Sequence, residues 1–231
     1  MTTHLAPVKS YTVQRVEEPS EELINECTTL FTELMKDDNA IISLCGGDPA
    51  LLPLMSGAML RAGSRFGEFY TATDPEAPGR VVGYTMWMPP GRDLFDSEEQ
   101  RKMGLIEFME RMPEAGKEYY KSIYMVEWPK FVNKVLGPTG KTDSWWMHMA
   151  MVRPEYQKQG IATALMQPVR DKIDLKATQN KETLAWSTTS ELNVRIYLSM
   201  DAELKGGRMM PSPWGKWPLY VFEVEPQESA V

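Results

Sequence analysis

The sequence predicts an α/β domain in which a mixed central β-sheet of about six or seven strands is flanked by helices. Short apolar runs of strand length alternate along the chain with longer segments of helical periodicity. Residues 145–152 are mostly aromatic, sulfur-containing or aliphatic, which is typical of a buried strand. The 231 residues are 42% hydrophobic, enough for one large core, so we expect a single domain over residues 1–231.

The first half of the chain supplies strands and helices in turn. Pro19-Ser20-Glu21-Glu22 has the features of a helix start, with acidic residues in the first turn. Asp48-Pro49 has similar features, and the apolar spacing after it is helical. The expected elements are a strand at 9–16, one or two helices within 20–44, a helix from 48 to 62, and strands at 68–73 and 80–88.

Residues 92–143 are predicted to form a helical insertion before the strand at 145–152. Helical spacing extends over 98–112 and 114–135, with Pro113 between the two segments. We expect this insertion to form a wall or lid of a substrate site. Its aromatic side chains either line an acceptor pocket or pack between helices; they are Tyr119, Tyr120, Tyr124, Trp128 and Phe131.

The last part of the chain is expected to complete the sheet. Residues 145–225 form its core, in which the apolar positions from Ile161 onward recur at helical spacing. The other expected elements are strands at 183–188, 203–210 and 217–224, a helix over 190–199, and a tail without regular structure at 226–231.

The turn between the strand at 145–152 and the following helix has the chemistry of a phosphate site. The first amides of a helix have no partner inside it and lie at the positive end of its dipole, so they bind anions. Gly160 and Ala162 keep side chains out of the way, while Lys158 and Arg153 add positive charge. An ordinary loop before a helix would show the same pattern, so neighbouring motifs must decide.

Two motifs together resemble a known family. The order Val-x-Pro, aromatic residue, Gln-x-x-Gly-x-Ala and amphipathic helix, here residues 152–165, resembles the acetyl-CoA signature of the GNAT superfamily of N-acetyltransferases. Downstream, Asn193 and Tyr197 resemble the Asn-x-x-x-Tyr element of the same superfamily. The similarity covers residues 145–225. The C-terminal half is most similar to puromycin N-acetyltransferase-type members, which also carry a proline like Pro168 in the cofactor helix.

The sequence also departs from these relatives. Where a family member often has Gly-Phe after the tyrosine-bearing helix, this chain has Asp201-Ala202. The puromycin-type group has an acidic residue on the strand before the asparagine, where this chain has Trp186-Ser187-Thr188. The strand and turn resemble arylalkylamine N-acetyltransferases as well, in which a histidine occupies the position of His148.

The resemblance implies the GNAT fold and an enzyme that transfers an acetyl group from acetyl-CoA directly to the amine of a small molecule. It implies that Tyr197 is the general acid and makes His148 a candidate base; a buried histidine satisfied by its neighbours is the alternative. Strand alternation places His148 on the face of Trp146, Ala150 and Val152. The implied cofactor-binding residues are Ala150, Met151, Val152, Gln157, Lys158, Gln159, Gly160, Ile161, Ala162, Thr163 and Asn193.

Two other functions stay open at this point: a peptide or protein N-acetyltransferase, and a non-catalytic regulatory module that binds acyl-CoA. The net charge of −7 argues against a nucleic-acid-binding surface. Two cysteines and two histidines without metal-ligand spacing predict a metal-free protein. Met1 to Ser10 lack the apolar core of a signal peptide and no membrane span is expected, so the predicted location is cytoplasmic. The acceptor amine and the oligomeric state stay undetermined.

Overall fold

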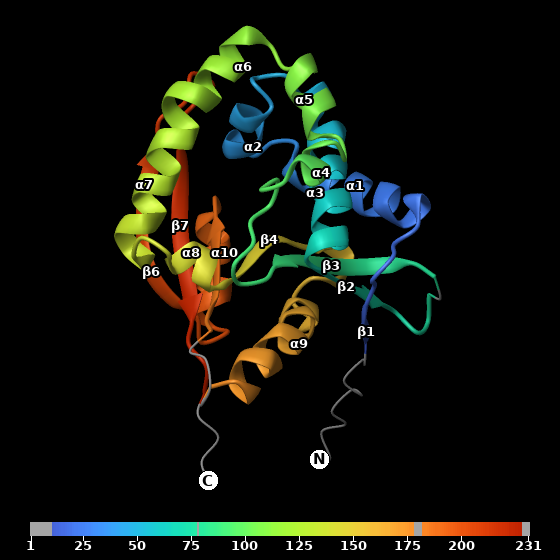
Figure 1. Cartoon of the computed structure of the whole chain (residues 1–231). Helices are drawn as coiled ribbons and strands as arrows, with labels where there is room; N and C mark the ends of the chain where they lie inside the picture. The colour runs from blue at the N-terminus through green and yellow to red at the C-terminus, as the bar shows by residue number, and fades with distance from the viewer. Residues whose placement is uncertain (1–10, 78, 178–181, 228–231) are drawn as a thin grey trace, which may run out of the picture.

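Seven strands form one mixed β-sheet in the order β1-β2-β3-β4-β5-β7-β6 (Figure 1). The structure is a computed structural model that describes residues 11–77, 79–177 and 182–227. The strands are β1 Thr12–Arg15, β2 Glu68–Thr73, β3 Val81–Met88, β4 Trp145–Val152, β5 Leu184–Thr188, β6 Glu203–Met210 and β7 Trp217–Val224. The α/β class and the strand number agree with the prediction. Residues 9–10 of the expected first strand and 228–231 of the expected tail lie outside the described residues.

The pairing of β4 with β5 is short. The other neighbouring strands in the sheet run antiparallel, whereas β4 and β5 run parallel. Their partners are limited to the first three residues of each strand, from Trp145 opposite Leu184 to Met147 opposite Trp186. Beyond Met147 the two strands pair no further, so the edge of β4 that faces β5 is open over the rest of its length.

Helices cover both faces of the sheet (Figure 1). Apolar side chains of α9 pack with Trp87, Trp186 and Phe222 on one face. On the other face, α1 and α3 pack with Met86 and Met149. The longer helices are α1 Glu21–Met35, α3 Leu52–Phe66, α7 Met125–Leu136, α9 Ile161–Leu175 and α10 Glu191–Leu198; the short helix α2 spans Asn39–Leu44 and the 3₁₀ turns η1 and η3 span Pro49–Leu51 and Pro154–Tyr156. Within the described part of the chain, no helix combines the length and the apolar character that a membrane span requires.

The insertion forms an arch of helices over the sheet (Figure 1). The prediction of one helix over 98–112 is wrong, because the chain breaks at Gly104, whose φ is +122°. The second predicted segment is a nearly continuous helical rod that includes a π-helical turn and passes through Pro129. The elements of the insertion are α4 Glu98–Arg101, α5 Leu105–Arg111, α6 Glu114–Tyr119, η2 Tyr120–Tyr124, α7, and α8 Gly140–Asp143.

A bulge in β4 changes which side chains face the insertion. Met149 lies opposite Met86 while Met147 lies opposite Trp87, so His148 is an extra residue without a partner on β3. Before the bulge the odd-numbered side chains of β4 face α9, and after it the even-numbered ones do. The predicted sharing of a face by His148, Ala150 and Val152 is therefore wrong, because strict alternation does not hold across a bulge.

A buried carboxylate joins β2 to α9. The side chain of Glu68 is 9% exposed and forms an ion pair with Lys172 of α9. The hydroxyl of Tyr70 donates a hydrogen bond of 2.7 Å to Glu68, and Arg15 of β1 lies 3.4 Å from its other oxygen. A buried charge with three partners orients the elements that provide them. Glu68 therefore fixes α9 against the antiparallel half of the sheet.

We predict that Glu68→Gln will lower the free energy of unfolding by about 1–3 kcal/mol, because Lys172 loses its buried counter-charge. Glu17→Gln is the matched control, since Glu17 also contacts Arg15 but its side chain is 76% exposed. The control should change stability by less than about 0.5 kcal/mol. Urea unfolding curves of the two variants and the wild type will measure both changes. Equal stabilities of the two variants would refute the role assigned to Glu68.

Candidate active site

The open edge of β4 presents main-chain groups that β5 does not pair with. The amide of Arg153 donates to the carbonyl of Val82, which makes this a hydrogen-bonded pair of the antiparallel ladder. Every second residue of β4 therefore directs its N–H and C=O groups toward β3. Ala150 and Val152 lie between these residues and direct their N–H and C=O groups toward the gap beside β5. Met151 instead faces β3 with its main chain, and its side chain lies in the core beneath α1 and α3.

The turn between β4 and α9 directs a series of amides outward. Lys158 and Gly160 both adopt left-handed backbone conformations, with φ of +61° and +78°. Within the described chain, no hydrogen bond is donated by the amides of residues 158–163. A Cβ atom built on Gly160 would meet nothing within 4 Å, so the space in front of these amides is open. The turn has the geometry of an anion-binding helix N-terminus.

The side chains of this turn serve different purposes. Gln157 donates a hydrogen bond of 3.1 Å to the carbonyl of Val152, which ties the turn to the end of β4. Gln159 donates to the carbonyl of Glu155 and contacts the hydroxyl of Tyr11. Arg153 is an ion-pair partner of Glu26 at 2.9 Å, so its charge is used inside the fold. Lys158 is exposed and is the cation that remains at the turn.

Helix α10 brings Asn193 and Tyr197 to the side of the gap opposite β4. The amide of Asn193 donates to the hydroxyl of Thr188 at 3.1 Å, which anchors α10 to the end of β5. The ring of Tyr197 lies 5.0 Å from that of Trp186 and 5.4 Å from that of Phe222. Burial raises the pKa of Tyr197 to about 12, so its hydroxyl is protonated at neutral pH.

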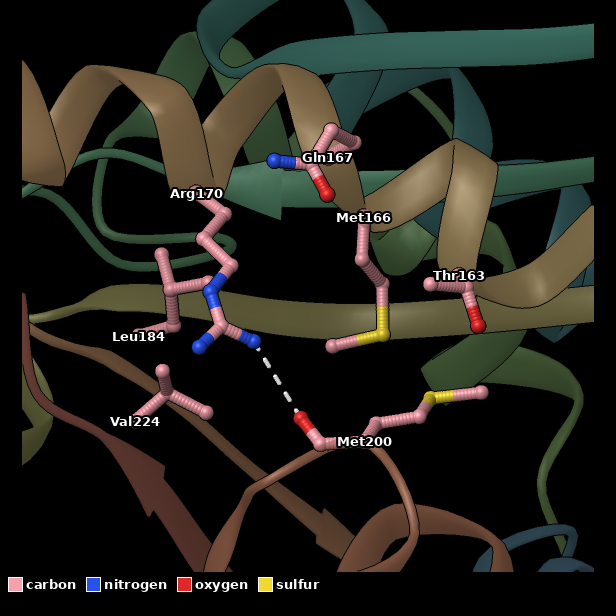
Figure 2. A pocket seen from close by; sticks show the side chains of 7 residues that line it. All are labelled: Thr163, Met166, Gln167, Arg170, Leu184, Met200 and Val224. Carbon is pink, nitrogen blue, oxygen red and sulfur yellow. Dashed lines mark hydrogen bonds between the residues drawn. The ribbon is translucent and has the colours of Figure 1, made fainter. Parts of the chain in front are cut away.

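A small hollow lies between α9 and the C-terminal end of α10. Figure 2 shows Thr163, Met166 and Arg170 of α9 on one side of it and Met200 on the other. Its volume is about 30 Å³, and Arg170 closes one end by donating a hydrogen bond of 3.2 Å to the carbonyl of Met200. This bond joins α9 to the segment that follows α10.

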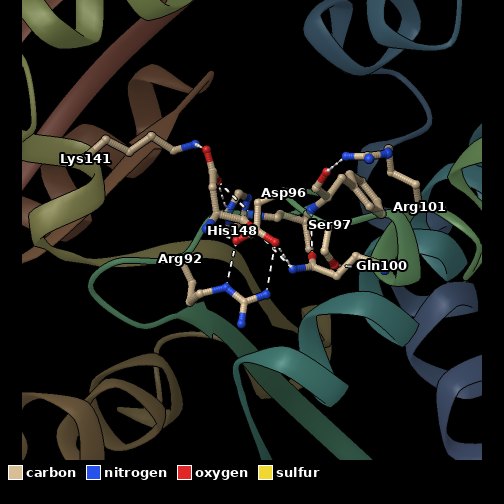
Figure 3. A network of polar contacts seen from close by, with 10 residues as sticks. Arg92, Asp96, Ser97, Gln100, Arg101, Lys141 and His148 are labelled. Carbon is tan, nitrogen blue, oxygen red and sulfur yellow. Dashed lines mark hydrogen bonds and ion pairs between the residues drawn. The ribbon is translucent and has the colours of Figure 1, made fainter.

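His148 lies on the insertion side of β4 with two charged neighbours (Figure 3). Its Nε2 atom is 3.6 Å from a carboxylate oxygen of Asp93, and the other oxygen of Asp93 forms an ion pair with Lys141. Burial lowers the pKa of His148 and outweighs the effect of the nearby carboxylate. Burial raises the pKa of Asp93, but the facing imidazole and ammonium lower it far more. Neutral His148 beside ionised Asp93 can accept a proton.

The loop that carries Asp93 is held by a polar network (Figure 3). Arg92 makes a two-point ion pair with Asp96, with distances of 2.7 and 3.0 Å. The fully buried amide of Gln100 accepts a hydrogen bond from the amide of Phe95 and donates to Asp96. These hydrogen bonds join residues that lie within a few positions of one another in the loop. They hold the loop in one conformation, so Asp93 approaches β4 from a defined direction.

Aromatic rings lead from the insertion to His148. Successive ring centroids from Tyr120 through Tyr124, Trp128 and Trp146 to His148 are between 5.3 and 6.5 Å apart. The other two predicted pocket residues have structural roles. Tyr119 is buried and accepts a hydrogen bond from Trp217, and Phe131 packs into the core beneath α7.

Sequence reasoning missed Asp93 because it lies 55 positions before His148, and it missed Lys141, only seven positions before His148, because neither residue belongs to a recognisable motif. Two other carboxylates of the insertion have different surroundings: Glu127 pairs with Arg208 at 3.0 Å, and Asp143 is exposed. No hydrogen bond, ion pair or ring contact joins His148 to Tyr197 among residues that the structure describes. In the same residues, no group of three or more His, Cys, Asp or Glu side chains could hold a metal ion.

Comparison with known proteins relates a large part of the chain to one family. Residues 65–195, more than half of the chain, match the model of a family described as the acetyltransferase (GNAT) family. This match includes β4, the amide-lined turn, α9 and the first half of α10. No curated protein has a sequence that matches this one significantly.

Solved structures share the fold at low sequence identity. An agmatine N-acetyltransferase mutant in its apo form has a TM-score of 0.59 at 13% identity, over 93% of this chain and 99% of its own. The structure of histone acetyltransferase HPA2 and related acetyltransferase from Corynebacterium glutamicum has a TM-score of 0.58 at 14% identity, over 96% and 99%. The Drosophila melanogaster polyamine N-acetyltransferase, which forms N-acetylagmatine, has a TM-score of 0.56 at 14% identity, over 94% and 100%. These likenesses establish the fold alone.

We predict that His148→Gln will make the protein less sensitive to mild acid. Because the pKa of His148 is lowered in the folded state, the unfolded chain binds a proton near pH 6.5 that the folded protein does not bind. The stability of the wild type therefore falls as the pH drops below 6.5, and the variant lacks this component. Thermal melts between about pH 7.5 and 5.5 will measure the difference. Identical pH dependence in both proteins would contradict the environment described for His148.

Proposed function

The chain belongs to the acetyltransferase (GNAT) family, and on that premise we propose that it transfers the acetyl group of acetyl-CoA directly to the amine of a small molecule. One observation carries the proposal. The unpaired amides of residues 158–163 and the open edge at Ala150 and Val152 follow one another along β4, the turn and α9. They offer main-chain donors for a diphosphate at one end and for an amide-containing arm at the other.

In this proposal the turn binds the diphosphate of the cofactor. The amides of residues 158–163 donate hydrogen bonds to it, and the exposed ammonium of Lys158 adds charge. Main-chain groups of Ala150 and Val152 bind the pantetheine arm in the gap, where one amide polarises the thioester carbonyl. Asn193, whose side chain is held by Thr188 at the end of β5, is the proposed cofactor contact from α10. Met151, whose main chain pairs with β3, supports the edge without facing it.

The proposed chemistry uses both sides of the gap. His148 accepts a proton from the ammonium form of the acceptor, and the neutral amine then attacks the thioester carbon, so a C–N bond forms and the C–S bond breaks. Tyr197 protonates the departing thiolate and recovers a proton from the nitrogen, which loses its second proton as the amide forms. Burial that raises the pKa of this phenol also raises the pKa of a thiol in the same apolar surroundings, so the departing thiolate is a stronger proton acceptor there than in water.

Direct transfer is favoured over a covalent acyl-cysteine. Cys27 and Cys45 are both buried, and burial raises the pKa of each thiol to about 12. A thiol with such a pKa supplies almost no thiolate at neutral pH. Neither cysteine therefore has the properties of a nucleophile.

The proposed acceptor is a small amine. Two structural neighbours are described as acting on agmatine or polyamines, and the third belongs to a protein described as a histone acetyltransferase. The aromatic line from Tyr120 to Trp146 favours the small-amine function, because its rings surround the insertion side of His148 with apolar surface. The similarity of the C-terminal half to puromycin N-acetyltransferase-type members is one guide to the choice of amines to test.

The test is incubation with acetyl-CoA and a panel of alkylamines, polyamines, arylalkylamines and peptides, with product masses measured. A mass increase of one acetyl group on a small amine, with release of CoA thiol, is the expected result. Acetylation of peptides alone would support the peptide or protein N-acetyltransferase instead. Binding of acetyl-CoA without any transfer would identify a regulatory acyl-CoA-binding module.

We predict that Gly160→Val will weaken acetyl-CoA binding by roughly tenfold or more, because its side chain would fill the open space in front of the amides. Gly79→Val is the matched control: its φ of +82° is similar, and a Cβ there also meets nothing within 4 Å. Both variants should lose about 1–2 kcal/mol of stability from the left-handed conformation. Calorimetric titration with acetyl-CoA will show whether only Gly160→Val loses affinity; equal losses would exclude the turn as the binding site.

We predict that Tyr197→Phe will lower kcat roughly a hundredfold, the usual size of a lost general acid, and leave acetyl-CoA affinity unchanged. Tyr220→Phe removes a hydroxyl whose contact is with Glu191 at 3.5 Å, and it should keep full turnover. Steady-state kinetics and calorimetry will separate the two effects. Full turnover by Tyr197→Phe would remove the acid assignment.

A further inference from the structure

The ammonium group of Lys141 occupies a site with the features of an amine-binding pocket. Its Nζ atom is 5.1 Å from the ring centroid of Trp128 and 5.5 Å from that of Trp146. The two rings are nearly perpendicular, with an interplanar angle of 80°. Asp93 completes the site with an ion pair to the same Nζ atom. A carboxylate and two indole faces are a strong combination for binding an organic cation.

This site adjoins the proposed catalytic groups. The carboxylate that pairs with Lys141 also faces His148, one oxygen toward each. Trp146 and His148 both belong to β4 and lie on its insertion side, just before the open edge at Ala150. An amine bound where the Lys141 ammonium now lies would therefore be beside the proposed base.

The pocket is not sealed. The side chain of Asp93 is 37% exposed, whereas that of Lys141 is 16% exposed. Lys141 lies on α8, a helix of only four residues that connects α7 to β4. The carboxylate is therefore accessible from solvent, and the group that covers it belongs to a short connecting segment.

We propose that Asp93, Trp128 and Trp146 bind the ammonium group of the acceptor amine, and that Lys141 fills this site until the acceptor displaces it. The proposal rests on the proposed function and specifies its substrate as an amine that arrives as a cation. Displacement removes the ammonium of Lys141 from Asp93 and replaces it with that of the acceptor. His148 then has the acceptor nitrogen within its reach.

A titration with propylammonium tests the site without any acetyl transfer. Tryptophan fluorescence of the whole protein reports binding at Trp128 and Trp146, and 1-butanol serves as the neutral probe of similar size. Lys141→Met should bind propylammonium at least about tenfold more tightly than the wild type, because no internal cation competes. Lys141→Arg should stay as weak as the wild type.

Two further variants control for indirect effects. Lys134→Met removes an exposed lysine from neighbouring α7 and should bind like the wild type. Adding Asp93→Asn to Lys141→Met should abolish the tighter binding. The proposal is overturned when Lys141→Met leaves the affinity unchanged, when the double variant keeps the gain, or when 1-butanol binding improves equally.

A measurement on the wild type covers the case in which Lys141→Met does not fold. Acylation of Lys141 by an N-hydroxysuccinimide ester, followed by peptide mass spectrometry, should be slow and should accelerate when tetramethylammonium displaces the side chain. No acceleration overturns the proposal. These readouts do not require turnover. If acetyl transfer is observed but Lys141→Met does not bind propylammonium more tightly, the inference alone is refuted. If Lys141→Met binds propylammonium more tightly but no acetyl transfer is observed, the proposed function alone is refuted.

Discussion

The early end of the pairing between β4 and β5 is the constraint on which the rest of the structure depends. Three residues of each strand pair, and the main chain of β4 beyond Met147 is left open on that side. Unsatisfied main-chain groups inside a fold cost free energy unless a ligand or water binds them. The amides of the following turn continue the same open line. The fold therefore keeps an extended line of main-chain hydrogen-bonding groups along β4 and the turn.

The sequence predicted the features that depend on short-range rules. The strands at 145–152, 203–210 and 217–224 have the predicted bounds, because apolar alternation and turn residues define them locally. The turn was recognised from its spacing, and its left-handed Gly160 fits that reading. Asp201 stands where a family member often has glycine, and it adopts the left-handed conformation with φ of +61°. The amide of Ala202 donates a hydrogen bond to the carbonyl of Tyr197, which ends the helix as a glycine would allow.

The features that sequence analysis missed depend on distant partners. The bulge that turns His148 away from the face of Ala150 is set by the register with β3, which nothing in residues 145–152 specifies. Asp93 meets Lys141 across 48 positions and His148 across a still longer separation. Gly104 breaks a helix whose apolar spacing alone predicted continuity. Such contacts arise only when the sheet and the insertion assemble.

The insertion therefore contributes charge to the site as well as a wall. Its first loop carries Asp93, and buried Gln100 holds that loop by hydrogen bonds to both Phe95 and Asp96. A loop held this way keeps a carboxylate beside the buried imidazole of His148. The bulge has a different effect: His148 stays on the insertion side with Trp146, while Ala150 and Val152 face α9. The inserted loop therefore brings the carboxylate to the imidazole, and the irregular strand separates that pair from the face that Ala150 and Val152 share.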